Sequence, residues 1–412
     1  MGRPFRERIP LSEALRMISE LDLRRVGLER VSVFESCGRI LAEDIIAKWD
    51  VPHFDRAAMD GYAVRAEDTF GASLTNPISL KLVGEIEIGE KAGRIGKGEA
   101  ARISTGAMMP EGANAVVMLE FTEERDGYVD VFKAVTPWEN VSKKGEDVKA
   151  GEVVLRRGEI VQPQDVGVIA SLGYKVVRVL RRPKVGVLAT GNELLEVGEV
   201  PKDGKIINSN SPMICCVLRN FGCDPVYLGR VGDEFQEIER ALKGSIESCD
   251  AVVITGGTSA GKRDLVPDVV SGLGKVVFHG IAIKPGMPTG LGVIDNKPVL
   301  MLPGFPVACL IALQTIFPEV LAKLTGVKVL ARRGSIVKAK LERRVPSQPG
   351  VRTFVRVLLE NGVAKPVRSS GSGILTSMVR ANGMLIVPEE REGYEEGTVV
   401  DVILIRDIVK VS

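Results

Sequence analysis

The sequence predicts a multidomain protein in which a doubly wound α/β domain is combined with β-rich domains. Its 412 residues are more than one hydrophobic core usually holds, so we expect roughly two to four domains. Between residues 184 and 326, short apolar runs typical of buried strands alternate with segments of helical periodicity. This alternation is typical of a parallel sheet covered by helices. Residues 78–135 and the chain beyond about residue 330 show successive short strand patterns instead, which predicts β-rich domains.

The composition is that of an ordinary soluble protein. Hydrophobic residues make up 45% and charged residues 26% of the chain, and 55 basic residues balance 53 acidic ones. This balance gives no electrostatic reason to expect nucleic acid or a membrane surface as a partner. The N-terminus lacks the apolar core of a signal peptide, and no apolar run approaches the ~18 residues of a membrane span. We therefore expect a cytoplasmic protein.

Histidine and cysteine are scarce. The chain has 6 cysteines and 2 histidines, and no two cysteines are spaced as CxxC. A structural zinc site or histidine-based catalysis is therefore not expected, and any bound metal would be held by carboxylates.

The most informative stretch runs from Asp250 to Pro267, with the sequence DAVVITGGTSAGKRDLVP. Its apolar start predicts a buried strand, and the glycines that follow predict a tight turn. The exposed N–H groups and hydroxyls of residues 256–261 can form an anion-binding nest. Asp264, directly after two cations, indicates a bound metal or a proton transfer beside that anion site. The simpler interpretation is a glycine-rich connector between a strand and a helix.

Four more loops follow predicted strands of the same domain. They contain Asn192 and Glu193, Asp233, Lys284 with Pro285, and the segment from Pro303 to Pro306. Because ligands of doubly wound sheets bind beyond the carboxyl ends of the strands, we expect these loops to converge on one rim. Each loop alone is ordinary, and Asp233 could simply cap the next helix. Ser211 is likewise expected to cap a helix that starts at Pro212.

Chemically active side chains also lie outside this domain. Asp60 and Asp147 lie in predicted loops of the preceding half, and Thr105 lies in a hydroxyl–glycine turn. Ordinary charged surface turns would explain these residues equally well. Arg352 and Arg356 alternate along a predicted strand, so they could bind an anion together, although solvated strand charges are the simpler interpretation.

Ordered motifs along the chain carry a resemblance to a known family. They are MDGYAV (59–64), STGAMMPEGANAVVM (104–118), GED (145–147), ATGNEL (189–194), NSN (208–210), TGGTSAGKRD (255–264), IKPGMP (283–288), LPGFPV (302–307) and SGSGIL (370–375). In these motifs the chain closely resembles the molybdopterin molybdenumtransferases, the family that includes the E domain of gephyrin. The resemblance extends over nearly the whole chain.

The resemblance implies a subunit of four domains. Residues 6–25 and 180–329 would form the α/β molybdopterin-binding domain, and residues 26–46 and 148–179 a discontinuous linker domain. Residues 47–147 would form a β-rich domain inserted into the linker, and residues 330–412 a small C-terminal β domain. The family also implies a homodimer. Because an elongated subunit would hold Asp60 far from Asp264, we expect a composite active site in which two subunits meet.

The implied reaction is insertion of molybdate into adenylylated molybdopterin, with release of AMP. Acids drawn from Glu193, Asp233 and Asp264 would hold a Mg²⁺ ion, and a protein of the molybdopterin adenylyltransferase type is an expected upstream partner. Catalytic roles are expected for the acids Asp60, Asp147, Glu193, Asp233 and Asp264. Substrate contacts are expected for Thr105, Gly256, Gly257, Ser259, Gly261, Lys284, Pro285, Pro303, Gly304, Pro306, Arg356 and Ser372.

The chain departs from the family pattern at four positions. Met287 stands at a lysine position, Phe305 at an amide position, Ala308 at a hydroxyl position and Asn192 at an acidic position. These departures leave tungstate open as the oxyanion in place of molybdate. Two other functions also stay open. One is a molybdopterin adenylyltransferase or nucleotide-pyrophosphate hydrolase built on the same α/β domain, and the other is a non-catalytic scaffold like gephyrin.

Overall fold

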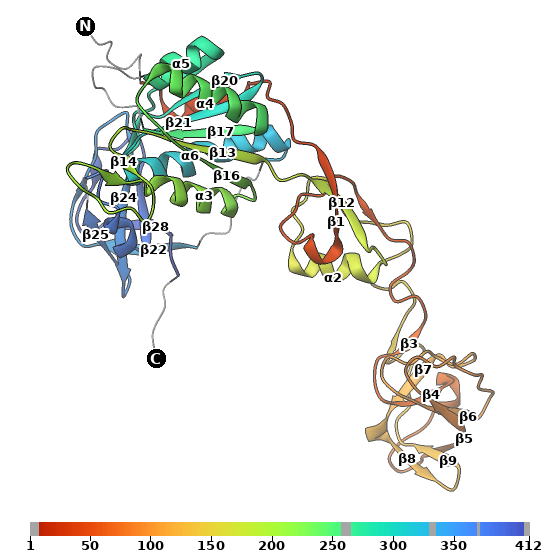
Figure 1. The fold of residues 1–412 in the computed structure, drawn as a ribbon. Coiled ribbons are helices and arrows are strands. Elements are labelled where there is room, and N and C mark those ends of the chain that lie inside the picture. The colour runs from red at the N-terminus through yellow and green to blue at the C-terminus, as the bar shows by residue number, and fades with distance from the viewer. Residues whose placement is uncertain (1–7, 257–264, 329–334, 369–370, 408–412) are drawn as a thin grey trace. The chain divides into compact units, whose positions relative to one another are not determined.

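The computed structural model describes residues 8–256, 265–328, 335–368 and 371–407 (Figure 1). The chain divides into two compact units. One comprises Leu28–Val179, and the other comprises Met1–Gly27 together with Leu180–Ser412.

The second of these units contains the predicted α/β domain, built on one 6-stranded sheet. Its strands, in spatial order, are β16 (Asp224–Val231), β13 (Lys184–Thr190), β17 (Ala251–Thr255), β21 (Lys297–Leu302), β20 (Gly290–Ile294) and β18 (Lys275–His279). The pairs from β16 to β21 are parallel, whereas β20 and β18 continue the sheet antiparallel. The α/β fold is confirmed, but the expectation of a purely parallel sheet is wrong at this edge. A short turn at Asp295–Asn296 joins β20 to β21, and such a turn can only make a hairpin.

Both faces of the sheet are buried, because alternate apolar residues of each strand point to opposite sides. Val185 and Val253 pack into one core, and Leu188 and Ile254 pack into the other. The first core is covered by α1 (Leu11–Ser19), α3 (Asn210–Asn220) and α6 (Pro306–Thr325), and the second by α4 (Phe235–Ser248) and α5 (Leu265–Leu273) (Figure 1).

Helix α6 is the longest described helix, and by length and composition alone it could span a membrane. However, 61% of its most apolar stretch is buried inside the protein, and residues such as Ile316 and Phe317 lie in the core of the α/β domain. The helix begins with Pro306 at its first position and ends at Gly326 in the left-handed conformation. Its hydrophobicity is therefore explained by packing against the sheet.

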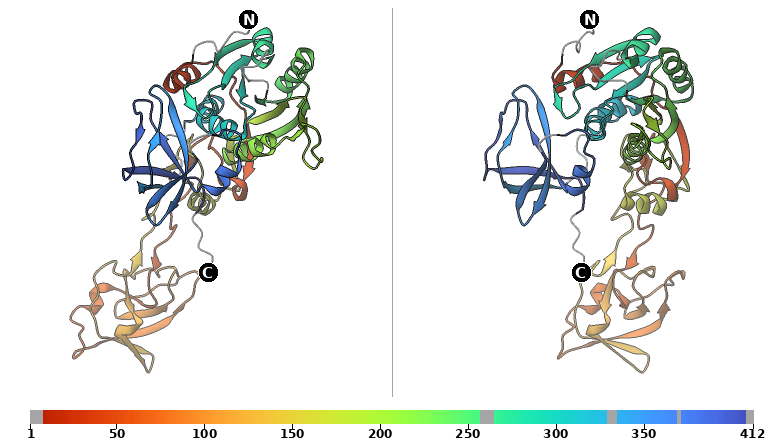
Figure 2. Two further views of the ribbon diagram at one scale, coloured as in Figure 1. Left: turned by 90° about the vertical axis from the view of Figure 1, so that its left-hand side faces the viewer. Right: turned by 60° about the vertical axis from the view of Figure 1, so that its left-hand side comes forward.

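The C-terminal β domain is a closed ring of strands (Figure 2). Each strand pairs with the next in the order β24 (Arg352–Glu360), β25 (Val363–Arg368), β22 (Ile336–Leu341), β28 (Val399–Leu404) and β26 (Gly383–Val387), and β26 pairs back with β24. One pair, β22 with β25, is parallel. Apolar side chains including Val357, Leu385 and Val402 fill the interior. Closure leaves this ring without a free edge.

The β ring is joined to the α/β domain by backbone pairing. Strand β19 (Ile283–Lys284) pairs in parallel with β24, with Lys284 opposite Thr353. Met384 of the ring also packs against Val307 and Ile311 of α6. Lys284 was expected in a loop at the carboxyl edge of the parallel sheet. It lies instead on a strand that belongs to the ring's sheet.

The unit Leu28–Val179 contains two packed parts, the first with one core and the second with two. Segments before residue 52 and after residue 147 share the first, in which Leu41 and Ile45 pack against Ile169 and Leu172. Its elements are β1 (Leu28–Ser32), β2 (Ile45–Ile46), β11 (Val153–Leu155), α2 (Pro163–Ser171) and β12 (Val176–Leu180). The chain between them forms a second body, a 6-stranded sheet. In spatial order its strands are β7 (Ala115–Met118), β4 (Gly61–Val64), β6 (Glu99–Ile103), β5 (Ile78–Ile86), β9 (Tyr128–Val131) and β8 (Thr122–Arg125).

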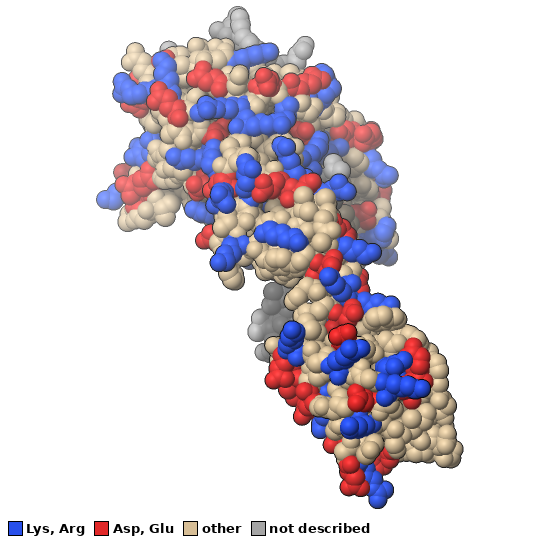
Figure 3. Space-filling model, turned by 90° about the vertical axis from the view of Figure 1, so that its right-hand side faces the viewer, with Lys and Arg blue, Asp and Glu red and all other residues tan. Residues whose placement is uncertain are grey.

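Charged side chains of both signs are interspersed over the face drawn in Figure 3. Some surface charges pair with near neighbours in the sequence, as Arg16 does with Glu13 and Glu20. This mixture agrees with the near balance of basic and acidic residues in the sequence.

Gly61 in β4 is a position where only glycine fits. A Cβ atom there would lie 1.9 Å from the carbonyl oxygen of Val117 on the neighbouring strand. We therefore expect Gly61→Ala to destabilise the β-rich sheet by about 2–3 kcal/mol, because the paired backbones must move apart. Hydrogen exchange of amides in β4 and β7, measured in the full chain, reports this loss.

Gly93→Ala is the matched control, because a Cβ atom at Gly93 of the same domain would meet nothing within 4 Å. Equal exchange protection of β4 and β7 in the two variants would contradict the close approach at Gly61.

Candidate functional site

The carboxyl ends of β13, β17 and β21 lie at one edge of the sheet. Ala189 is in register with Thr255, and Thr255 is in register with Leu302. A cavity of about 670 Å³ lies at this edge, lined by residues that include Thr190, Thr255, Gly256, Pro303 and Gly304. Of the five strand ends predicted to converge on one rim, those of β13, β17 and β21 therefore contribute described residues to one cavity.

Close backbone approach shapes the floor of this cavity. Gly256 has φ +96°, and a Cβ atom there would lie 2.1 Å from the carbonyl oxygen of Thr190. A larger residue would push the ends of β13 and β17 apart. The glycine of the TGG motif is thus required by backbone geometry at this position.

The side chain of Asn210 links two of the loops. Its Nδ2 donates to Thr255 Oγ1 at 3.2 Å and to the Gly304 carbonyl at 2.7 Å. Thr190 Oγ1 and Asn210 Oδ1 are buried and have no hydrogen-bond partner among the described residues. Such unmet polar atoms destabilise a fold by about 1–3 kcal/mol each, so they are more typical of functional sites than of structural cores.

Acidic residues line the rim. Asp233 Oδ2 accepts from the Asn192 N–H at 3.1 Å, and Asn192 Oδ1 accepts from the Asp233 N–H at 3.3 Å. Glu193 lines the cavity beside them and is exposed. Asp233 does not cap α4, because that helix begins at Phe235 and Asp233 is engaged with the neighbouring loop. The two loops therefore brace one another and present two carboxylates to solvent.

Sequence reasoning missed Glu237 on this rim. Its Oε2 accepts from the Gly232 N–H at 3.0 Å, so it holds the loop that carries Asp233. The signal was an acid in the first turn of a helix, directly after a glycine turn.

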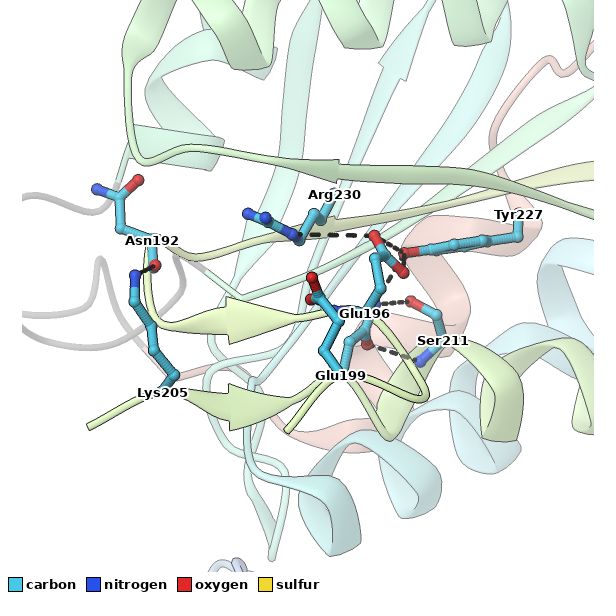
Figure 4. A network of polar contacts seen from close by, with 8 residues as sticks. Asn192, Glu196, Glu199, Lys205, Ser211, Tyr227 and Arg230 are labelled. Atoms are coloured by element: carbon cyan, nitrogen blue, oxygen red, sulfur yellow. Dashed lines mark hydrogen bonds and ion pairs between the residues drawn. The ribbon is translucent and has the colours of Figure 1, made fainter. Parts of the chain in front are cut away.

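A polar network holds the outer wall, formed by the short strands β14 (Leu194–Leu195) and β15 (Ile206–Ile207) (Figure 4). Tyr227 of β16 donates to the Glu196 carboxylate at 2.9 Å and accepts from Asn208 Nδ2 at 3.1 Å. Burial, together with this carboxylate, raises the pKa of Tyr227 to about 12. The tyrosine therefore remains a hydrogen-bond donor throughout the physiological range.

Asn208 also sets the start of α3. Its Oδ1 accepts from the Ser211 N–H at 3.2 Å, and the helix begins at Asn210. The expectation that Ser211 caps this helix is wrong, because Asn208 supplies the acceptor three residues earlier.

A second cavity of about 330 Å³ adjoins the first, and Lys284, Arg356 and Ser372 line it. Arg356 is only 2% exposed, so its charge is not the solvated strand charge that the sequence suggested. Arg352 does not join it and instead pairs with Glu389 at 2.7 Å. The carbonyl of Ser372 accepts from the Val307 N–H at 3.0 Å, which ties the ring's loop to the start of α6.

The remaining predicted residues of this region lie around the two cavities. Pro306 lines the larger cavity, Pro285 lines the smaller, and Pro303 lines both. Met287 lines the smaller cavity, and its sulfur lies 3.8 Å from a guanidinium nitrogen of Arg8. Gly257, Ser259, Gly261 and Asp264 lie outside the described residues.

The unit Leu28–Val179 contains the other predicted acids. Asp60 Oδ1 accepts from the Thr105 N–H at 2.6 Å and from its hydroxyl at 2.8 Å. These bonds, the backbone one first, lower the pKa of Asp60 below its ordinary value. Asp147 is exposed, and its N–H donates to the Val51 carbonyl at 3.1 Å. Asp60 and Thr105 are thus one hydrogen-bonded pair, which the sequence did not reveal.

Within the described residues, no cluster of three histidine, cysteine, aspartate or glutamate side chains could hold a metal ion by itself. The expected third carboxylate, Asp264, lies outside those residues. Glu193 and Asp233 nevertheless supply exposed carboxylate oxygens, the ligands that Mg²⁺ prefers, and Mg²⁺ sites often use one or two carboxylates together with substrate phosphates.

Comparisons with known proteins identify the family. Residues 9–173 match the MoeA N-terminal region (domain I and II), residues 186–323 match a probable molybdopterin binding domain, and residues 338–405 match the MoeA C-terminal region (domain IV). The chain belongs to the MoeA family. The resemblance drawn from the sequence motifs is therefore confirmed.

Full-length relatives support this assignment. The chain is 41% identical to a putative molybdopterin biosynthesis protein of Methanocaldococcus jannaschii, over 97% of this chain and 98% of that protein. It is 36% identical to the molybdopterin molybdenumtransferase of Bacillus subtilis, over 97% and 94% of the two chains. A crystal structure of the molybdopterin biosynthesis moeA protein from Pyrococcus horikoshii superposes with a TM-score of 0.84 at 38% identity, covering 97% of this chain and 100% of that one.

The pairing of Asp60 with Thr105 makes a pH prediction. Because the pKa of Asp60 is lowered in the folded protein, the carboxylate interaction is present above the ordinary aspartate pKa and is lost as the pH falls through the lower, folded value. Thr105→Val removes the hydroxyl donor but keeps the backbone N–H, so we expect the pKa of Asp60 to rise part of the way toward its ordinary value. NMR titration of carbon-labelled aspartate carboxyl groups measures it.

Thr122→Val is the matched control, because the Thr122 hydroxyl donates to the Leu119 carbonyl. An Asp60 pKa that is the same in the wild type and Thr105→Val would show that the hydroxyl does not stabilise the carboxylate.

Proposed function

We propose that this protein inserts molybdate, or tungstate, into adenylylated molybdopterin with Mg²⁺-dependent release of AMP. The observation that carries the proposal is the pair of adjoining cavities with different chemistry. The larger has carboxylates and close-packed backbone at its rim, and the smaller has two cationic side chains and a serine. The substrate joins a phosphoanhydride to a dithiolene that must receive an oxyanion, so it needs both kinds of environment.

The larger cavity suits the nucleotide end of the substrate. Its volume of about 670 Å³ lies within the ~300–1,000 Å³ of typical small-molecule sites. Gly256 and Gly304 leave backbone exposed where phosphates would lie, and the positive end of the 20-residue helix α6 adjoins them.

Glu193 and Asp233 would hold the Mg²⁺ ion, with Asp264 as the expected third acid. When bound, the ion neutralises charge on the phosphoanhydride and polarises the attacking water. The reciprocal bonds between Asn192 and Asp233 hold this carboxylate in place before substrate arrives. The asparagine at position 192, an acidic position in the family, thus has a positioning role of its own.

The smaller cavity suits the oxyanion. Lys284 and the buried Arg356 supply positive charge, and Ser372 supplies a hydroxyl. Molybdate and tungstate are both tetrahedral dianions, and a site of this composition would attract either. Met287 and Ala308 make part of the wall apolar, so fewer charged groups surround the anion than the family pattern would give.

Insertion requires that oxo groups leave as water, and protons must be delivered for this. We assign this proton handling, or the orientation of the dithiolene, to Asp60 and Asp147. The lowered pKa of Asp60 favours its ionised form, which suits this carboxylate to accepting hydrogen bonds and so to orienting protonated groups. We propose that in a homodimer the unit carrying Asp60 completes the site of the partner subunit.

The proposed substrate is an adenylylated compound, so an adenylyltransferase must supply it. A protein of the molybdopterin adenylyltransferase type is the proposed upstream partner.

The first functional prediction concerns Asp233. We expect Asp233→Asn to reduce AMP release at least about a hundredfold, because it removes a charge that holds the metal. The fold should survive, since the change is isosteric and exposed. Phosphate-anhydride cleavage is followed by chromatographic detection of AMP at saturating Mg²⁺.

Glu239→Gln is the control, because Glu239 pairs with Lys243 on the outer surface of α4. If Asp233→Asn releases AMP as fast as Glu239→Gln, the assignment of Asp233 as a Mg²⁺ ligand would be contradicted.

The second functional prediction concerns the composite site. Asp60→Ala and Asp233→Ala subunits, each inactive alone, are mixed and allowed to exchange. With random exchange about half the dimers are mixed, each with one intact site, so roughly a quarter of wild-type activity should return.

Native mass spectrometry confirms that exchange has occurred. Mixed dimers without activity would mean that both acids serve a site within one subunit, and the composite arrangement would be wrong.

A further inference from the structure

Three apolar residues separate the two cavities. Pro288, Pro303 and Phe305 line both the larger and the smaller cavity. We call these three residues the apolar ridge. On one side of the ridge lie the acids and glycines of the sheet edge, and on the other lie Lys284 and Arg356.

Phe305 is the exposed member of the ridge. The residue is 63% exposed, which for an isolated surface phenylalanine would carry no meaning. Here, however, the ring lies on the wall that two polar cavities share. An exposed aromatic ring at that place does not stabilise the free protein, whereas a bound ligand could cover it.

The backbone of Phe305 is held rigidly. It is the N-cap residue of α6, with φ −71° and ψ 125°, and its carbonyl accepts from the Cys309 N–H at 2.9 Å. Asn210 fixes the preceding residue through its bond to the Gly304 carbonyl. The ring is therefore presented from a fixed support, which reduces the entropy lost when a ligand is bound.

The ring of Phe305 lies near the loop of the C-terminal β domain. A Cβ atom at Gly373 would lie 3.3 Å from Phe305 Cδ1 and 3.5 Å from Cε1. The glycine lets this loop approach the ring edge without a side chain between them.

We propose that Phe305 is the platform against which the flat ring system of the pterin stacks. The inference rests on the proposed function and names how this chain recognises that part of the substrate. Stacked on Phe305, the pterin ring system would place its phosphate substituent toward the larger cavity and its dithiolene toward the cations of the smaller one. Stacking on an aromatic face accepts any flat heterocycle of the right size and fixes its plane.

A purely structural role would give a different outcome. If Phe305 only packs against the loop at Gly373, its removal loosens that loop and affects stability and every ligand alike. If Phe305 is a stacking platform, its removal weakens binding of the pterin and leaves the affinity for AMP unchanged.

The experiment measures binding in the intact full-length protein without turnover. Hydroxymethylpterin is titrated by its fluorescence and AMP by equilibrium dialysis, for wild type, Phe305→Ala, Phe305→Trp and Phe235→Ala. Phe235 is the matched control, because it is also exposed and also lies at the N-terminal end of a helix, but lines neither cavity.

We expect Phe305→Ala to raise the Kd for the pterin about tenfold, with the Kd for AMP and the unfolding temperature unchanged. Phe305→Trp should bind the pterin as well as wild type, and its tryptophan fluorescence should be quenched at saturation. Phe235→Ala should match wild type for both ligands.

Wild-type pterin affinity in Phe305→Ala, or tryptophan fluorescence in Phe305→Trp that does not respond to the pterin, would overturn the proposal. Equal weakening of pterin and AMP binding would also overturn it, because that result indicates a purely structural role. Weakening of AMP binding alone would overturn it too, because adenine would then be the group that stacks on the ring. Because binding is measured without turnover, absence of AMP release from adenylylated molybdopterin would refute the proposed reaction and leave this result standing.

Discussion

Both faces of strands β13, β17 and β21 are buried under helices, and this burial determines where polar chemistry can lie. Side chains such as Val253 and Ile254 alternate between two apolar cores, so no charged group can be placed along the strands without leaving water. Polar groups are therefore confined to the edge where the strands end. There the close approach of Gly256 to Thr190 and the links made by Asn210 bring the loops together, and the larger cavity follows from that geometry.

The smaller cavity depends on a second constraint, the docking of the C-terminal β ring. Strand β19 leaves the α/β domain to pair with β24, and the Ser372 carbonyl takes the free N–H of Val307 at the start of α6. These two contacts bring Lys284, Arg356 and Ser372 to one place. Arg356 is buried in the wall of this cavity, so docking of the ring places a cationic side chain beside Lys284.

The sequence predicted the parts of the site that local patterns control. Apolar runs ending in Thr190, Thr255 and Pro303 located the strand ends, because strand length and glycine turns are local properties. It failed where tertiary contacts decide. Lys284 belongs to the sheet of another domain, Asp233 bonds to a neighbouring loop instead of capping α4, and Arg356 is buried by a ring that closes only when distant strands pair. The bond between Asp60 and Thr105 joins residues 45 positions apart, and no single-sequence pattern predicts such a contact. Met287, Phe305 and Ala308, which depart from the family pattern, all lie on the walls of the smaller cavity. Their proximity is visible only in the three-dimensional structure.

We propose that nucleotide release in the larger cavity is coupled to oxyanion insertion in the smaller one. The most direct measurement is the stoichiometry of AMP released and metal incorporated when the wild-type protein is given adenylylated molybdopterin, Mg²⁺ and either molybdate or tungstate. The account predicts equal amounts of AMP and metal-containing product, with little AMP when no oxyanion is present. Full AMP release with no metal incorporated from either oxyanion would show a nucleotide-pyrophosphate hydrolase and would contradict the account.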